Sequence, residues 1–237
     1  ETDIEVSGIK DNVMIGRVGG SGSKSRSETF AVIEDLLEFA SSLNLKDMES
    51  YKDIADLIDD SPIAESMDLH PRDIKALYNL VNDDLPLIIS ANRASDLLKL
   101  IDLKLKYDLN LIIMGAQEAG LVADKIAKNN IPLIINPINN IPESFDELAA
   151  NIELAAYLEK QGITLMFNAP RSHNFHLIRQ GAGVAVANGM SYAGALRALT
   201  SSPVEVFNLG DRGEIVAGKV ADLIIWDCLL YTSDAAD

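Results

Sequence analysis

Leu85-Pro-Leu-Ile-Ile-Ser-Ala91 is a short apolar run, and residues 95–107 follow it with apolar side chains at helical spacing. The same order recurs along the chain, with further apolar runs at 109–116, 131–137 and 163–168 and an amphipathic stretch after each. Continuous apolar strands that alternate with helices are typical of a parallel sheet covered on both faces. The sequence therefore predicts an α/β fold with four parallel strands whose order in the sheet follows the chain.

The first 84 residues are less regular than the rest. Residues 13–15 are a candidate strand, residues 19–27 form a Gly/Ser loop, and Ser27 is a suitable N-cap for a helix that runs to about Ser41. Residues 44–66 are acidic and follow no clear period. Further helices are expected at 68–81, 121–127, 144–161, 177–188 and 192–201.

The pattern changes again after Pro203. Residues 213–226 contain two apolar stretches joined by a Gly-containing turn, and no amphipathic segment follows them. This arrangement predicts a terminal β-hairpin that belongs to an antiparallel element rather than to the parallel sheet.

Composition narrows the possible functions. The 237 residues include 20 Lys and Arg against 36 Asp and Glu, which gives a net charge of −16, and 48% are hydrophobic. This apolar content is enough for a sizeable core and argues against disorder. The acid excess argues against nucleic acid and anionic membrane surfaces as partners. No window of 18 uncharged apolar residues predicts a membrane span. The chain begins at Glu1 with no signal-peptide pattern, so its compartment is left open.

The last ten residues, Cys228–Asp237, match a translated transposon end used in sequencing-library preparation, residue for residue. We therefore treat residues 228–237 as a non-native tail and leave them out of the fold prediction. Without Asp234 and Asp237 the net charge changes from −16 to −14. The only cysteine, Cys228, also falls in this tail, which argues against thiol catalysis and disulfides.

Two local motifs have ordinary explanations. Residues 16–25 are similar to a phosphate-binding loop, but Ser23 separates Gly22 from Lys24 where the motif requires Gly-Lys in succession, which favours an ordinary loop. His173 and His176 lie just after the fourth apolar run, where ligands bind in parallel α/β folds. A zinc pair needs a third protein ligand, and no acidic residue stands at a matching strand end, which favours loop or core histidines.

Polar residues follow each predicted strand, at 90–93, 115–118, 136–137 and 168–173. The carboxyl ends of parallel strands meet at one edge, so these residues are candidates for a ligand pocket, although solvated loop residues are the plainer interpretation. Asn and Arg side chains there would suit a polar or anionic small molecule. The candidate substrate-binding residues are Ser90, Asn92, Arg93, Asn168, Arg171 and His173.

Several segments together resemble the C-terminal half of the amidohydrolase superfamily, and most closely its imidazolonepropionase-like and prolidase-like branch. The segments that carry the resemblance are Pro86–Asp96, Gly115–Ala119, Ser172–Asn174, Arg179–Gly189, Ala198–Pro203 and Gly213–Asp227. The resemblance implies the C-terminal half of a distorted TIM-like (β/α)8 barrel over residues 1–203. It also implies that residues 204–227 return to a small β-sandwich whose remaining strands belong to an N-terminal half. We therefore expect the apolar side chains of this segment to be exposed, namely those of Val216, Val220, Leu223, Ile225 and Trp226.

The resemblance further implies a metal site, usually for zinc or another divalent metal, at the carboxyl ends of the strands. In active relatives a His-Ala-His-Arg-like segment corresponds to Ser90–Arg93, and the next metal-binding His corresponds to Gly115. The catalytic Asp corresponds to Asn168 or Arg171. Every ligand expected in this half is thus replaced, so we predict no metal site and no cofactor in it.

Two functions follow from this comparison. The first is a hydrolase of carbon–nitrogen bonds in a cyclic amide or dipeptide-like substrate. The second is a catalytically silent relative that binds a small-molecule ligand, or that forms homo- or hetero-oligomers with an active paralogue. A fold does not confer activity without its site, so the replaced ligands favour the second hypothesis.

Overall fold

The computed structural model describes residues 13–19, 25–44, 51–66, 69–139, 141–169 and 176–225. These residues divide between two compact units. The amino-terminal unit contains Lys10–Ile89 and Asp102–Leu111, and the carboxyl-terminal unit contains Ser90–Ile101 and the chain from Ile112 onward. The tail at 228–237 and most of the Gly/Ser loop lie outside the described residues.

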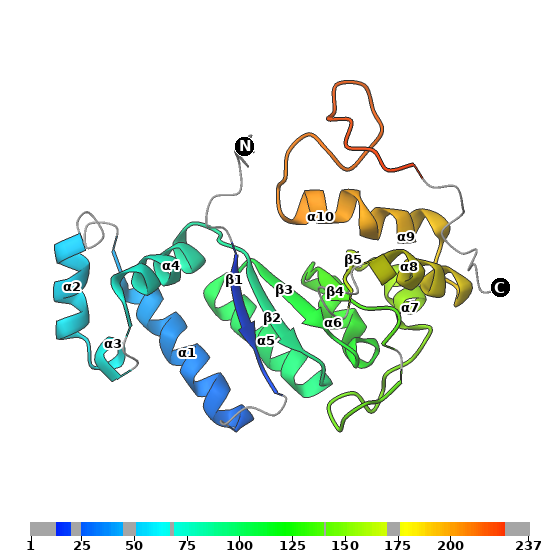
Figure 1. Ribbon diagram of the computed structural model, residues 1–237. Helices are drawn as coiled ribbons and strands as arrows, with labels where there is room; N and C mark the ends of the chain where they lie inside the picture. Colours follow the sequence, from blue (N-terminus) through cyan, green and yellow to red (C-terminus); the bar gives the residue numbers. More distant parts are fainter. Residues whose placement is uncertain are drawn as a thin grey trace. The chain divides into compact units, whose positions relative to one another are not determined.

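Five strands form one sheet in the order β1-β2-β3-β4-β5, which is also their order along the chain. β3 pairs with β4 and β4 with β5 in parallel register. The four predicted strands and the candidate strand at 13–15 are therefore confirmed (Figure 1). The strands are β1 (Met14–Arg17), β2 (Leu87–Ala91), β3 (Leu111–Gly115), β4 (Leu133–Ile135) and β5 (Leu165–Phe167).

The amino-terminal unit is mainly helical, with α1 (Arg26–Ser42), α2 (Tyr51–Asp60), α3 (Pro62–Ser66) and α4 (Pro71–Asn82). Its core is an apolar cluster that α1 and α4 line together with single residues of α2 and α3. α2 and α3 fall in the acidic stretch 44–66, where no helix was predicted. Ile54, Leu57 and Ile58 of α2 do have helical spacing and pack in or against the core cluster, but the acidic residues around them make this spacing difficult to recognise. The cluster consists of Phe39, Ala40, Leu43, Ile54, Ala64, Ile74, Leu77 and Tyr78.

Two caps set the starts of these helices. The Ser25 Oγ accepts a hydrogen bond from the Glu28 backbone N–H at 3.2 Å, so Ser25 is the N-cap of α1 and the prediction of Ser27 was wrong by two residues. His70 caps α4: its Nδ1 accepts from the Arg72 N–H at 3.2 Å, and the Asp73 carboxylate accepts from the His70 N–H at 2.8 Å. This reciprocal pair is a capping box, which gives His70 a structural role.

In the carboxyl-terminal unit each strand is followed by helical structure, as expected. The elements are α5 (Ala94–Tyr107, whose last residues belong to the other unit), a 3-10 turn η2 (Ala119–Val122), α6 (Ala123–Lys128), α7 (Leu154–Lys160), α8 (Ile178–Ala187), α9 (Tyr192–Leu199) and α10 (Ser201–Val206). Among their described residues, no helix combines the length and apolarity needed to cross a bilayer.

The helix predicted at 144–161 is wrong over its first half, since only 154–160 are helical. Local side-chain bonds compete with the helix in the preceding residues. The Ser144 Oγ accepts from the Asp146 N–H at 3.2 Å, and the Asn151 Oδ1 accepts from the Glu153 N–H at 2.8 Å. Bonds of this kind stabilise turns at the expense of helix. Residues 136–153, of which Asn140 is not described, are called the β4–α7 loop below.

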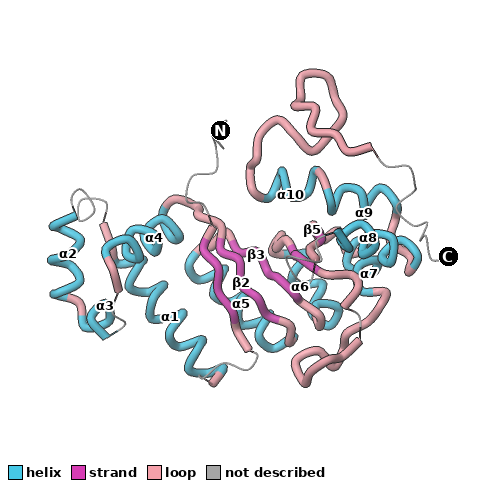
Figure 2. Tube along the Cα trace, viewed as in Figure 1, coloured by secondary structure: helices cyan, strands magenta, loops and turns pink. Residues whose placement is uncertain are grey.

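The predicted hairpin at 213–226 is also wrong for the described residues, because none of residues 213–225 is in a strand (Figure 2). A turn does form: the Lys219 N–H donates to the Val216 carbonyl at 3.2 Å, and Gly218 has φ +90°. A two-stranded hairpin is marginal unless another layer covers its apolar face, and the described residues place no such layer on it.

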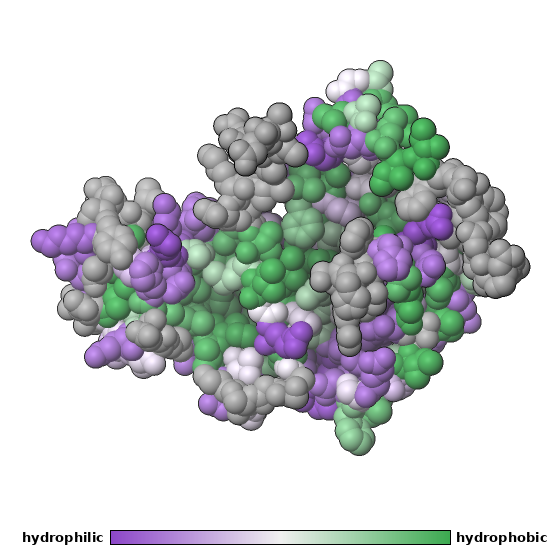
Figure 3. All heavy atoms as spheres, viewed as in Figure 1, coloured by the Kyte–Doolittle hydropathy of each residue, from purple (hydrophilic) through white to green (hydrophobic). Residues whose placement is uncertain are grey.

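The apolar side chains of this segment are accordingly exposed, as the sequence predicted for Val216, Val220, Leu223 and Ile225. Ile225 is 97% exposed. Hydrophobic surface is visible on the loop that follows α10 (Figure 3). Trp226, which was expected to be exposed with them, lies outside the described residues.

Candidate functional site

Polar residues gather at the carboxyl ends of the strands in the carboxyl-terminal unit. The parallel register aligns Ile135 with Phe167, so Asn136 and Asn168 follow their strands at the same level. The Asn168 N–H donates to the Ile135 carbonyl at 3.1 Å, which holds the two strand ends together. On the other side, the Ala116 N–H donates to the Ala91 carbonyl at 2.8 Å, just before Asn92. Three asparagine side chains thus follow β2, β4 and β5.

Each of these asparagines has one buried polar atom that makes no hydrogen bond to the described residues. The atoms are the Asn92 Oδ1, the Asn136 Nδ2 and the Asn168 Oδ1. A buried polar atom that lacks a partner costs about 1–3 kcal/mol, so such atoms are rare and call for an explanation. The only other such atom in the described part of the chain is the Tyr107 hydroxyl, outside this edge.

The end of β3 leaves room for the Asn92 amide. Gly115, the last residue of β3, has φ +93°, a conformation that side chains disfavour. A Cβ placed there would lie 2.3 Å from the Asn92 Oδ1, so the amide occupies the space that any side chain at 115 would need. This is the position where the resemblance implies a metal-binding histidine.

The β4–α7 loop is attached to the ends of β2 and β3 through two side chains next to Asn92. Arg93 pairs with the Asp146 carboxylate at 3.0 Å and donates to the Phe145 carbonyl at 3.1 Å. Glu118 is buried, and its two oxygens accept from the Ala94 N–H at 2.9 Å and from the Ala149 N–H at 3.3 Å. Arg93, predicted as a substrate-binding residue, is therefore engaged with this loop.

The other predicted residues are placed as follows. Ser90 is half-buried near the end of β2, and Asn168 follows β5. Arg171 and His173 lie outside the described residues, and His176 is exposed at the start of the turn before α8. Asn136, which is 9% exposed, was not among the six candidates. Its position directly after an apolar run is the signal that could have added it.

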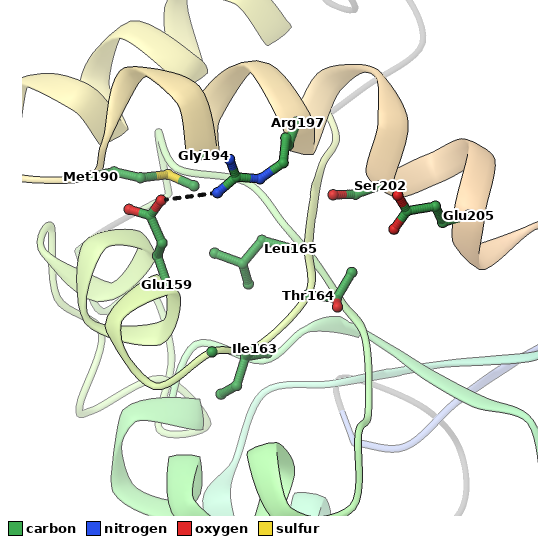
Figure 4. A pocket seen from close by; sticks show the side chains of 10 residues that line it. Glu159, Ile163, Thr164, Leu165, Met190, Gly194, Arg197, Ser202 and Glu205 are labelled. Carbon is green, nitrogen blue, oxygen red and sulfur yellow. Dashed lines mark ion pairs between the residues drawn. The ribbon is translucent and has the colours of Figure 1, made fainter. Parts of the chain in front are cut away.

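A separate cavity of about 220 Å³ lies beside the amino end of β5, away from the asparagines (Figure 4). Glu159 and Arg197 face each other across it, with the Arg197 Nη2 3.7 Å from the Glu159 Oε1. The same carboxylate accepts from the Ser191 N–H at 2.8 Å and from the Ser191 Oγ at 2.5 Å. Glu159 thereby secures the N-cap of α9, so the polar groups on this side of the cavity are engaged in helix capping. None of the six predicted residues lines this cavity.

Comparison with known proteins gives one family and several similar solved structures, two of which are described below. The sequence matches the amidohydrolase family over residues 93–236. The fold is similar to an amidohydrolase from Thermotoga maritima MSB8, with a TM-score of 0.73 and 20% identity over 91% of this chain and 57% of that one. A less similar structure is an uncharacterized metal-dependent hydrolase from Pyrococcus furiosus, with a TM-score of 0.49 and 15% identity over 77% of this chain and 38% of that one. No curated protein sequence matches the chain. The chain thus spans 57% of the length of the Thermotoga protein.

Proposed function

This chain belongs to the amidohydrolase family, and from that premise we propose that the carboxyl edge of its sheet binds a small neutral ligand through asparagine amides rather than through a metal. The observation that carries the proposal is a set of three buried amide atoms, on Asn92, Asn136 and Asn168, that have no hydrogen-bond partner among the described residues. All three lie at the edge where ligands bind in parallel α/β folds.

The amides suit a ligand that both donates and accepts hydrogen bonds. The Asn136 Oδ1 accepts from the Ile138 N–H at 3.2 Å, which leaves its Nδ2 as the free donor. The Asn92 Nδ2 donates to the Glu147 Oε1 at 2.7 Å, which leaves its Oδ1 as a free acceptor. An amide or urea group has an N–H that can donate to the Asn92 Oδ1 and a carbonyl that can accept from the Asn136 Nδ2. Because the free atoms are buried, the ligand enters when the β4–α7 loop moves away from Asn92.

The residues at this edge do not fit the divalent metal that the family resemblance implies. Zinc is held by His, Cys and carboxylate ligands, whereas Ser90, Gly115 and Asn168 supply a hydroxyl, no side chain and a neutral amide. The nearby carboxylates of Glu118 and Glu147 are occupied by N–H donors. Among the residues that the structure describes, no three His, Cys, Asp or Glu side chains are grouped as a metal site.

Family membership supports a second candidate, hydrolysis of a carbon–nitrogen bond in a cyclic amide or dipeptide-like substrate. The two candidates share the ligand chemistry and differ in turnover. In the silent alternative the protein retains binding alone, or assembles with an active paralogue.

The test is ligand binding by the purified protein, with metal content measured on the same sample. We expect 2-pyrrolidinone, a cyclic amide, to bind without added metal and to remain intact on long incubation. Asn136→Ala should weaken binding about tenfold, since it removes one hydrogen bond to a buried site. Asn129→Ala is the matched control, because Asn129 bonds only its own helix end on the surface. Stoichiometric zinc bound through residues of this edge, or equal binding by both variants, would contradict the proposal, whereas cleavage of the probe would favour the second candidate.

A further inference from the structure

Glu147 of the β4–α7 loop is connected to the candidate site by a hydrogen bond from Asn92. The Glu147 Oε1 accepts from the Asn92 Nδ2 at 2.7 Å, and its Oε2 accepts from the Glu143 backbone N–H at 3.3 Å. The two residues of the first bond are 55 positions apart in the sequence. Within the part of the chain that the structure describes, Glu147 makes no hydrogen bond to Asn136 or Asn168, so its influence on the site runs through Asn92.

A carboxylate at this position decides which way the Asn92 amide faces. An ionised carboxylate only accepts hydrogen bonds, so the amide must turn its NH2 group toward Glu147. Its carbonyl oxygen then lies over Gly115, in the space that the missing side chain leaves free. Charge-assisted bonds of this length are among the stronger ones in proteins, so the orientation is held firmly.

We propose that Glu147 is a positioning residue that sets ligand specificity: it holds Asn92 as a hydrogen-bond acceptor and thereby selects ligands with an N–H group. This inference rests on the proposed function, and it names the ligand atom that the site distinguishes. Asn136, whose orientation is fixed by Ile138, supplies the donor for the ligand carbonyl.

The proposal predicts the effect of reversing the hydrogen-bonding character at 147. Lys only donates, so in Glu147→Lys the Asn92 carbonyl turns toward residue 147 and the NH2 group turns toward the site. In the double variant Asn92→Asp/Glu147→Gln, the new carboxylate accepts from the new amide and keeps an acceptor toward the site. Glu143→Gln is the control on the same loop, because Glu143 contacts Glu147 through its backbone N–H and not through its exposed side chain.

The experiment compares two probes, 2-pyrrolidinone and N-methyl-2-pyrrolidinone, which lacks the N–H. We expect the unmodified protein, Glu143→Gln and the double variant to bind 2-pyrrolidinone about tenfold more tightly than its methylated form. In Glu147→Lys this preference should disappear or reverse. The double variant tests the proposal independently of whether Glu147→Lys folds. If the double variant lost the preference for 2-pyrrolidinone, that result alone would contradict the proposal.

A ligand-free measurement separates this inference from the proposed function. In the unmodified protein one Asn92 side-chain amide proton should show the downfield NMR shift of a bond to a carboxylate, and Glu147→Lys should abolish it. If neither probe binds but this shift behaves as expected, the proposed function fails while the positioning of Asn92 by Glu147 stands. If the shift or the probe preference is the same in Glu147→Lys as in the unmodified protein, the positioning role is refuted.

Discussion

Gly115→Ala is the substitution that most directly tests the geometry at the carboxyl edge. The new Cβ would lie 2.3 Å from the Asn92 Oδ1, so the Asn92 amide has to move. When it moves, its bond to Glu147 is lost. The backbone is strained as well, because residue 115 keeps φ +93°.

The expected loss of stability has two parts. An alanine in the left-handed region costs about 1–2 kcal/mol, and the lost bond to a charged group costs about 1.5–3 kcal/mol. The displaced Asn92 carbonyl regains water, which offsets part of this loss. We therefore expect Gly115→Ala to lower the free energy of unfolding by about 3 kcal/mol.

Gly162→Ala is the matched control, because Gly162 has φ +76° and no atom lies within 4 Å of the position of its Cβ. It should cost only the backbone part, about 1–2 kcal/mol. Urea unfolding of both variants, repeated in an Asn92→Ala background, measures the difference. In that background Gly115→Ala should cost no more than Gly162→Ala. Equal costs for the two glycine variants in the unmodified protein would refute the contact between residue 115 and Asn92.

Three further predictions concern other parts of the chain. Gly194→Ala should destabilise the protein by about 1–2 kcal/mol, a cost typical of a lost helix cap, because the new Cβ would lie 1.9 Å from the Glu159 Oε1. Thermal unfolding of Gly194→Ala in a Glu159→Ala background should show that most of this destabilisation is gone. The side-chain hydrogen bond to Glu34 raises the pKa of Lys106. The small contribution of this bond to the stability of the fold should therefore be fully present below about pH 10.4, and it should be lost as the pH rises through the raised pKa of Lys106. NMR titration should find that Glu34→Gln lowers the pKa of Lys106. Finally, Ile225→Ser should reduce self-association in light scattering without changing the melting temperature, since Ile225 is 97% exposed.

The strands β2 to β5 could be predicted because each contains a continuous apolar run, and the structure buries most residues of these runs. Ile112, Ile113 and Leu133, for example, are 0% exposed. Burial on both faces of a sheet leaves few polar positions in a strand, of which Ser90 in β2 is one, so the pattern is easily recognised. The edge where ligands bind follows from the same runs, since polar residues become frequent where each run ends.

Short elements rich in charged residues could not be predicted in the same way. In α2 the helical spacing rests on Ile54, Leu57 and Ile58, and the acidic residues around them make it difficult to recognise. The opposite error at 144–153 arises because helical spacing there competes with turns that Ser144 and Asn151 stabilise locally. The segment 213–225 has strand-like composition, but a strand forms only where a second strand pairs with it.

The roles of individual side chains at the site depend on contacts between distant parts of the chain. Arg93 follows a strand end, as a ligand-binding residue would, yet its guanidinium donates to the carbonyl of Phe145, which is 52 residues away in the β4–α7 loop. Asn92 is bonded in the same way to Glu147, and this bond determines which end of its amide is free. Sequence position therefore predicts which residues reach the edge of the sheet, whereas the loop that packs against them determines whether each one donates, accepts or is already occupied. A substitution of Glu147 in the β4–α7 loop should for this reason change ligand preference as strongly as a substitution at a strand end.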